Sequence, residues 1–177
     1  MKLIQHTGRS GMVRDRTAQS AVWGLLAILI LVLVASGLVD IYRLYAVRNW
    51  AYSVAQEAAM TGASRGRDWS AVTTSTEIRL NTDTALDEAD KIVSTEMSSR
   101  GISGYAADIR VLPNPGGGEM PDYPPNAVRL GLGLGSWSSN QPAVGVYLSL
   151  PVNWLILDRL GIIPKTVNVF ASAGVAE

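Results

Sequence analysis

The feature that most constrains this chain is an uninterrupted apolar stretch near its N-terminus. Residues 21 to 39 carry no charge and consist mainly of Leu, Ile, Val and Ala. An α-helix rises about 1.5 Å per residue, so a run of this length covers roughly the 30 Å hydrocarbon core of a bilayer. Trp23 lies near one end, and Tyr42 and Tyr45 follow the other, where interfacial aromatic residues are common. The sequence therefore predicts a transmembrane helix over residues 19 to 40.

The charges that flank this stretch predict its direction across the membrane. Basic residues predominate before it: Lys2, Arg9, Arg14 and Arg16, against Asp15 alone. The positive-inside rule then predicts a cytoplasmic tail over residues 1 to 18 and an extracytoplasmic domain over residues 41 to 177, at the inner membrane of the cell.

A cleavable secretory signal is the alternative interpretation of the apolar stretch. Ala35-Ser36-Gly37 would loosely serve as the small-residue cleavage site. The apolar run is longer than a typical signal core, and a helical pattern continues beyond it. These two properties favour a permanent anchor.

The helical pattern continues without proline or glycine from Asp40 to Gly62. Apolar residues from Val47 to Ala59 recur at intervals of three and four, which is typical of one buried helix face. We therefore expect one helix of roughly 40 residues that ends at Gly62 or Gly66.

Three alanines on this stripe, Ala51, Ala55 and Ala59, form a ridge of small side chains. Such a ridge lets another backbone approach closely. Two interpretations follow: the ridge packs on the chain's own domain, or it contacts a helix of a neighbouring subunit together with Trp23.

The rest of the chain predicts an α+β domain. A second helix is expected within residues 76 to 99, with Gly101 as its C-terminal stop. Beyond it the apolar residues alternate, which predicts an antiparallel sheet of about four strands covered by the long helix. The expected strands are residues 107–113, 127–137, 143–152 and 166–176, with a loop at 114–126.

The composition excludes several chemistries. The chain has no cysteine, and its single histidine, His6, lies in the N-terminal tail. The 15 basic residues balance the 15 acidic residues, so no nucleic-acid footprint is present. The alternating glycines at 131, 133 and 135 lie inside an expected strand with no helix after it, unlike a nucleotide-binding loop.

No catalytic or metal site emerges, and we expect neither an enzyme nor a bound cofactor. The acidic cluster on the second helix (Asp83, Asp87, Glu88 and Asp90) is typical of a solvated helix face. An anchored enzyme or ligand-binding domain remains as an alternative. It would require Asp87 to meet Glu119 or Asp122 in a cleft.

One short segment, residues 153 to 164, is more apolar than a small helix usually buries. Trp154, Leu155 and Leu157 are its main apolar side chains. They either close one end of the core or form a patch that docks a neighbour or the membrane surface.

The order of these elements resembles the TadE-like minor pilins of the tight-adherence (Flp-type) pilus system. The resemblance rests on "AQSAV" leading into the apolar helix, on "GLVDIYRLY", and on the Ala-rich "AQEAAMTGAS". It covers residues 14 to 65 best and 141 to 177 more loosely. It implies a pilin-like domain, processing between Ala18 and Gln19, and partners among other pilus or membrane subunits.

Two positions depart from the family pattern. Ala18 replaces the glycine before the cleavage point, and Trp23 replaces the glutamate at the fifth position after it. An uncleaved accessory subunit of another membrane complex is therefore the alternative to a pseudopilin with a structural or assembly role.

Overall fold

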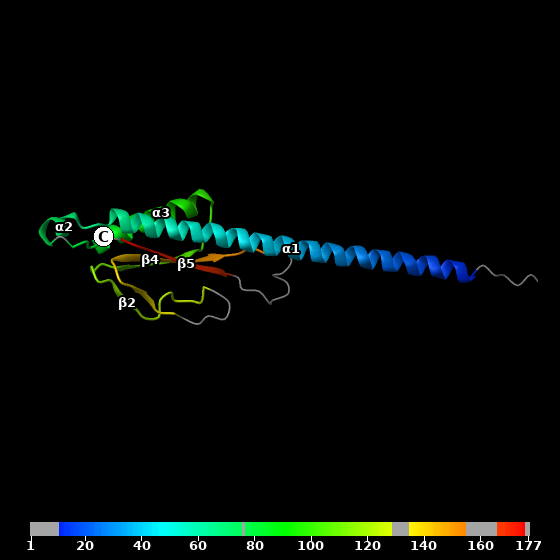
Figure 1. Cartoon of the computed structure of the whole chain (residues 1–177). Helices are drawn as coiled ribbons and strands as arrows, with labels where there is room; N and C mark the ends of the chain where they lie inside the picture. Colours follow the sequence, from blue (N-terminus) through cyan, green and yellow to red (C-terminus); the bar gives the residue numbers. More distant parts are fainter. Residues whose placement is uncertain (1–10, 76, 129–134, 155–165, 176–177) are drawn as a thin grey trace, which may run out of the picture.

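A computed structural model describes residues 11–75, 77–128, 135–154 and 166–175. One helix, α1 (Gly11–Arg65), runs along the whole molecule; its N-terminal part projects far beyond the other elements (Figure 1). The helix therefore continues past the apolar run, as predicted. It ends immediately before Gly66, whose amide donates to the carbonyl of Gly62 at 2.9 Å.

The N-terminal half of α1 is bare. Every described side chain from Gln19 to Ala35 is exposed. Its most apolar window of 18 residues has a mean hydropathy of 2.8, and none of that window is buried. The helix is thus long and apolar enough to cross a membrane, a criterion that a signal sequence near an N-terminus also meets.

The C-terminal half of α1 carries a buried stripe of small side chains. None of them is more than 3% exposed. They belong to a core shared with the second long helix and the sheet, so the same helix is a membrane-span candidate at one end and a core element at the other. The members of the stripe are Ala51, Val54, Ala55, Ala58, Ala59 and Ala63.

The predicted second helix is α3 (Thr82–Ser99). Asn81 caps its start, because its side-chain oxygen accepts from the Thr84 amide at 3.1 Å. Gly101 ends it with φ +63°, and the amides of Gly101 and Ile102 return to the carbonyls of Ser98 and Met97. This is a Schellman motif, in which glycine adopts the left-handed conformation at no steric cost.

A short helix, α2 (Trp69–Ser75), was not predicted. It lies between the two long helices in the sequence and begins immediately after Asp68. Its first turn is held by Asp68, whose Oδ1 accepts from the amides of Ser70 and Ala71 at 3.0 and 3.3 Å.

Three of the expected strands form one antiparallel sheet in the order β1–β4–β5. The strands are β1 (Ala106–Leu112), β4 (Ala143–Pro151) and β5 (Thr166–Gly174), each within two residues of the expected range. The central strand directs Val144, Val146 and Leu148 into the core under α1 and α3. The prediction that α1 covers this sheet is confirmed.

The prediction of a single sheet of about four strands needs correction. A separate two-stranded sheet is formed by β2 (Gly118–Met120), inside the expected loop, and β3 (Trp137–Ser139). Of the expected strand over 127–137, Ala127 and Val128 are not in a strand, Trp137 belongs to β3, and residues 129–134 lie outside the described residues. Strands of three residues are too short to show an alternating pattern of apolar residues. These two are also far apart in the sequence, so no local signal indicates that they pair.

The three-stranded sheet is therefore covered on both faces. On the face opposite α1, side chains from β4 and β5 pack with those of the two-stranded sheet and with Tyr123, which lies between its two strands in the sequence. The centroids of Trp137 and Phe170 are 6.0 Å apart, and those of Tyr123 and Phe170 are 5.4 Å apart, both edge-to-face. This second apolar cluster explains why odd-numbered residues of β4 are buried as well as even-numbered ones.

Candidate functional site

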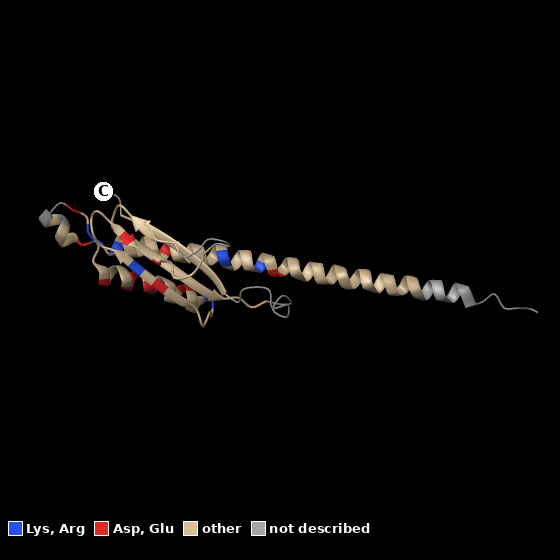
Figure 2. Cartoon of the chain, turned by 90° about the horizontal axis from the view of Figure 1, so that it is seen from below, with Lys and Arg blue, Asp and Glu red and all other residues tan. Residues whose placement is uncertain are grey.

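The predicted processing positions lie inside a continuous helix. Ala18 and Gln19 are both within α1, and no break occurs in the helix there. Trp23 is 63% exposed on the bare half of α1. Figure 2 shows that the charged residues gather on the outer domain and leave this half without charge up to its undescribed end.

The alanine ridge is inside the molecule. Ala51, Ala55 and Ala59 are each 0% exposed, enclosed by the sheet and α3. These three side chains therefore pack on the chain's own domain, which was the first of the two interpretations. The close approach extends to Gly62, where an added Cβ would lie 2.8 Å from the carbonyl oxygen of Ala85.

The apolar segment after β4 is only partly within the described residues. Trp154 is half-buried against the core, in keeping with a side chain that closes one end of it. Leu155 and Leu157 lie outside the described residues.

The acidic residues do not form a centre. Among the described residues, no group of three or more His, Cys, Asp or Glu side chains could hold a metal ion. Asp87 belongs to α3 and Glu119 to β2, which lie on opposite faces of the three-stranded sheet, so this pair does not converge in a cleft. Glu88 of the same cluster instead pairs with Arg65 of α1 at 2.7 Å.

Asp40 is a feature that the sequence pattern did not single out. It is 1% exposed at the end of the apolar run, and it is the one buried charged side chain among the described residues. It has an interaction partner, as a carboxylate in such a place requires. It marks the point along α1 where the helix passes from bare to covered.

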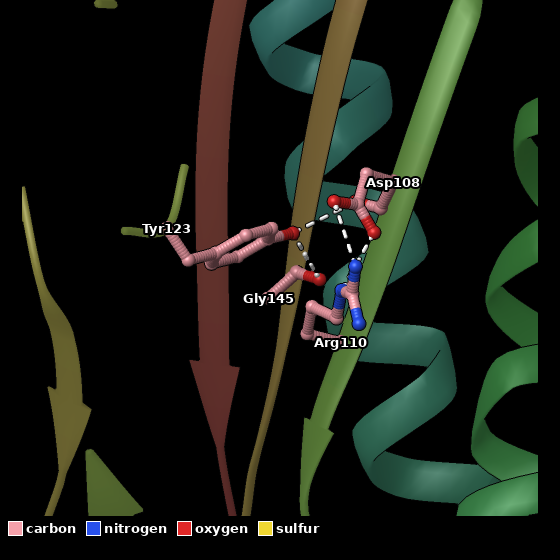
Figure 3. Close-up of polar contacts among 4 residues, drawn as sticks. All are labelled: Asp108, Arg110, Tyr123 and Gly145. Carbon is pink, nitrogen blue, oxygen red and sulfur yellow. Dashed lines mark hydrogen bonds and ion pairs between the residues drawn. The ribbon is translucent and has the colours of Figure 1, made fainter. Parts of the chain in front are cut away.

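Tyr123 fastens the segment before β3 to the sheet. Its hydroxyl lies 2.7 Å from the carbonyl oxygen of Asp108 and 3.1 Å from that of Gly145 and donates to this pair (Figure 3). Burial, and secondarily the nearby Asp108 carboxylate, raises the pKa of Tyr123 above its ordinary value. The Asp108 carboxylate itself pairs with Arg110 at 2.8 Å. These contacts tie the Tyr123 segment to the sheet.

A groove of about 940 Å³ lies between α1 and the segment that Tyr123 fastens. Arg48 of α1 crosses it and donates from a guanidinium nitrogen to the carbonyl of Val128 at 3.1 Å. From the other side, the amide of Asn126 donates to the Tyr147 hydroxyl at 3.0 Å. The described residues that line the groove are Tyr45, Arg48, Asn49, Tyr52, Tyr123, Pro124, Asn126, Val128, Gly135, Ser136, Trp137, Ser138, Val169 and Phe170.

Sequence patterns did not predict this groove. Its walls come from four separate segments, and only the spacing of Tyr45, Arg48 and Tyr52 on one side of α1 hinted at a shared surface. Comparison with known proteins adds no assignment: no family model, no curated protein and no solved structure matches the chain.

Proposed function

We propose that the chain is a single-pass, membrane-anchored subunit of the TadE-like pseudopilin type, with a structural or assembly role in a tight-adherence pilus or secretion apparatus. The observation that carries the proposal is the division of α1. One half is bare and apolar, and the other half is the central core element of the outer domain. No linker separates them, so a force or contact on the anchor reaches the domain through one helix.

The proposed orientation places residues 1–18 in the cytoplasm and the domain from residue 41 outside the inner membrane. The excess of basic residues before the apolar run supports it. In this orientation the bare half of α1 packs with helices of other subunits in the bilayer. The outer domain would present its sheets to neighbours in the apparatus.

An uncleaved accessory subunit of another membrane complex is the second candidate. The observation that favours it is the pair of substitutions at the processing site, Ala18 and Trp23, within a helix that runs unbroken through both. Such a subunit would keep residues 1–18 and use Trp23 as a contact in the membrane.

The intact mass of the chain extracted from its native membrane separates these candidates. A chain that begins at Gln19 supports the pseudopilin. A chain that keeps residues 1–18 supports the accessory subunit. A chain that begins near Leu38 contradicts both, because the apolar run would then be a removed signal.

A cysteine cross-link tests the proposed contacts in the bilayer. The chain has no native cysteine, so Leu26→Cys on the bare half of α1 provides a single reactive site. We expect oxidative cross-linking of Leu26→Cys to a helix of another subunit in native membranes. Met60→Cys, which is exposed on the outer half of the same helix, is the matched control. Failure of every single-cysteine variant along the bare half to cross-link would contradict a subunit role.

A further inference from the structure

The groove beside α1 has a position and a charge that the proposed function does not use. Its helical wall begins at Tyr45, a few residues beyond the apolar run, and extends to Tyr52. At about 1.5 Å per residue, Arg48 lies roughly 14 Å past Val39 along the helix. The headgroup layer adds roughly 5–8 Å on each side of the hydrocarbon core, so the Arg48 backbone lies about one helical turn beyond that layer.

The side chains of α1 lean toward that layer. In an α-helix the Cα–Cβ bonds tilt toward the N-terminus, which here is the membrane end. Long basic side chains extend further in this way and place their charge at the interface. A side chain of arginine's length at position 48 spans about that distance, and Tyr45 lines the groove on the side nearer the apolar run.

The described lining of the groove carries a positive charge. Arg48 is the one charged side chain among the described residues that line it, and the others offer hydroxyl, amide and aromatic groups. Its bond to Val128 uses one of the guanidinium donors. The remaining donors match the oxygens of a phosphodiester, to which arginine binds in a forked geometry.

We propose that this groove binds the headgroup of an anionic glycerophospholipid from the outer leaflet. The phosphodiester would contact the Arg48 guanidinium, and the polar headgroup would lie beside Tyr45, at the end of the groove nearest the membrane. The bound lipid would fix the height and rotation of the outer domain above the membrane. This inference rests on the membrane anchoring in the proposed function.

The test uses the full chain in a mild detergent and native mass spectrometry. The probes are phosphatidylglycerol and phosphatidylcholine with identical acyl chains. We expect the wild type to retain one phosphatidylglycerol in preference to phosphatidylcholine. Arg48→Gln should weaken phosphatidylglycerol retention about tenfold, the scale of a charge-assisted hydrogen bond, and abolish the preference over phosphatidylcholine, whose choline cation the wild-type arginine repels.

Arg43→Gln is the matched control. Arg43 is exposed on the same helix, closer to the membrane, and is not among the described residues that line the groove. We expect this variant to keep the wild-type preference. Equal losses in both variants would overturn the proposal, because they would indicate diffuse attraction to any basic residue. No preference in the wild type would overturn it as well.

Arg48→Gln also removes the bond to Val128, so a second measurement separates binding from local unfolding. A photoactivatable phosphatidylglycerol should cross-link the wild-type chain within residues 45–52. Cross-links confined to the bare half of α1 would overturn the assignment. Loss of the cross-link to residues 45–52 when a soluble glycan oligomer is added would also overturn it, because the groove would then bind glycan in place of lipid. Carbonate extraction of native membranes separates failure of the proposed anchor from failure of the lipid site. Release of the chain would contradict both. Retention of the chain in the membrane without a lipid preference would contradict the lipid site alone.

Discussion

At the scale of single residues, Gly62 is a point of close approach between α1 and α3. A Cβ added at Gly62 would lie 2.8 Å from the Ala85 carbonyl oxygen and 3.1 Å from the Ala89 Cβ. The first of these neighbours is backbone and cannot turn aside. Overpacking costs about 1–3 kcal/mol, whereas replacing a helical glycine gains at most about 1 kcal/mol.

We therefore expect Gly62→Ala to lower the free energy of unfolding by about 1–2 kcal/mol. Thermal unfolding of the full chain in detergent measures the effect. Gly24→Ala on the bare half of the same helix is the control, because an added Cβ there meets no atom within 4 Å. An unchanged or higher midpoint for Gly62→Ala would show that the two helices can move apart.

Tyr123→Phe isolates one buried hydroxyl. The ring remains in the aromatic cluster, but the carbonyls of Asp108 and Gly145 lose their donor. We expect a loss of about 1 kcal/mol. The exposed Tyr52→Phe should cost nothing measurable.

The pKa of the same hydroxyl is raised, because the fold favours its neutral form. The stability that this shift contributes is present below the ordinary value of 10.0 and is lost as the pH rises above it. The difference between the ultraviolet titrations of wild type and Tyr123→Phe, which isolates this hydroxyl, should therefore appear above pH 10.0. A difference that appears at or below pH 10.0 would contradict the buried bond.

At the scale of secondary-structure elements, α1 has a buried residue next to an exposed one. Ala55 is 0% exposed against the sheet, and Gln56 points to solvent. Ala55→Leu should destabilise the chain by about 1–3 kcal/mol through overpacking, and Gln56→Leu should be nearly neutral. The urea midpoint of each variant checks this. A neutral Ala55→Leu would mean that the ridge is accessible after all, and would revive its role as a contact between subunits.

The contact between α1 and α3 also carries a charge pair whose effect depends on pH. The hydrogen bond from Arg65 lowers the pKa of Glu88 below its ordinary value of 4.5. A lowered carboxyl pKa contributes stability that is present above pH 4.5 and is lost as the pH falls through the folded-state value. We expect the thermal midpoints of wild type and Glu88→Gln to differ at neutral pH and to converge in acid. A difference that persists in strong acid would assign the effect to packing.

The elements differ in how far the sequence could predict them. The long helix, α3 and the strands β1, β4 and β5 follow from periodicity and from stop residues such as Gly101, which act locally. The pair β2 and β3 could not be predicted, because its three-residue strands depend on Trp137 packing against Phe170, a contact between distant segments. The groove and the burial of Asp40 arise from the same kind of long-range contact.

At the scale of the whole molecule, one helix joins the apolar membrane-span candidate to the folded domain. In the proposed anchoring, the direction of this helix decides on which side of the membrane the domain lies. The apolar half of α1 does not by itself specify that direction, and the basic residues before it supply the only signal in the sequence. If the proposed orientation is correct, the groove and both sheets face the extracytoplasmic space, and the N-terminal flank faces the cytoplasm.

The absence of native cysteine makes this orientation directly measurable. Gly116→Cys places a thiol at an exposed position with no atom within 4 Å of the new Cβ, and Thr17→Cys places one in the N-terminal flank. A membrane-impermeant maleimide applied to cells with an opened outer envelope should label Gly116→Cys at once. Thr17→Cys should react only after the membrane is permeabilised. The reverse pattern would invert the topology, and equal labelling of both would mean that the chain does not span the membrane; in either case the groove would no longer face the leaflet from which we expect it to bind lipid.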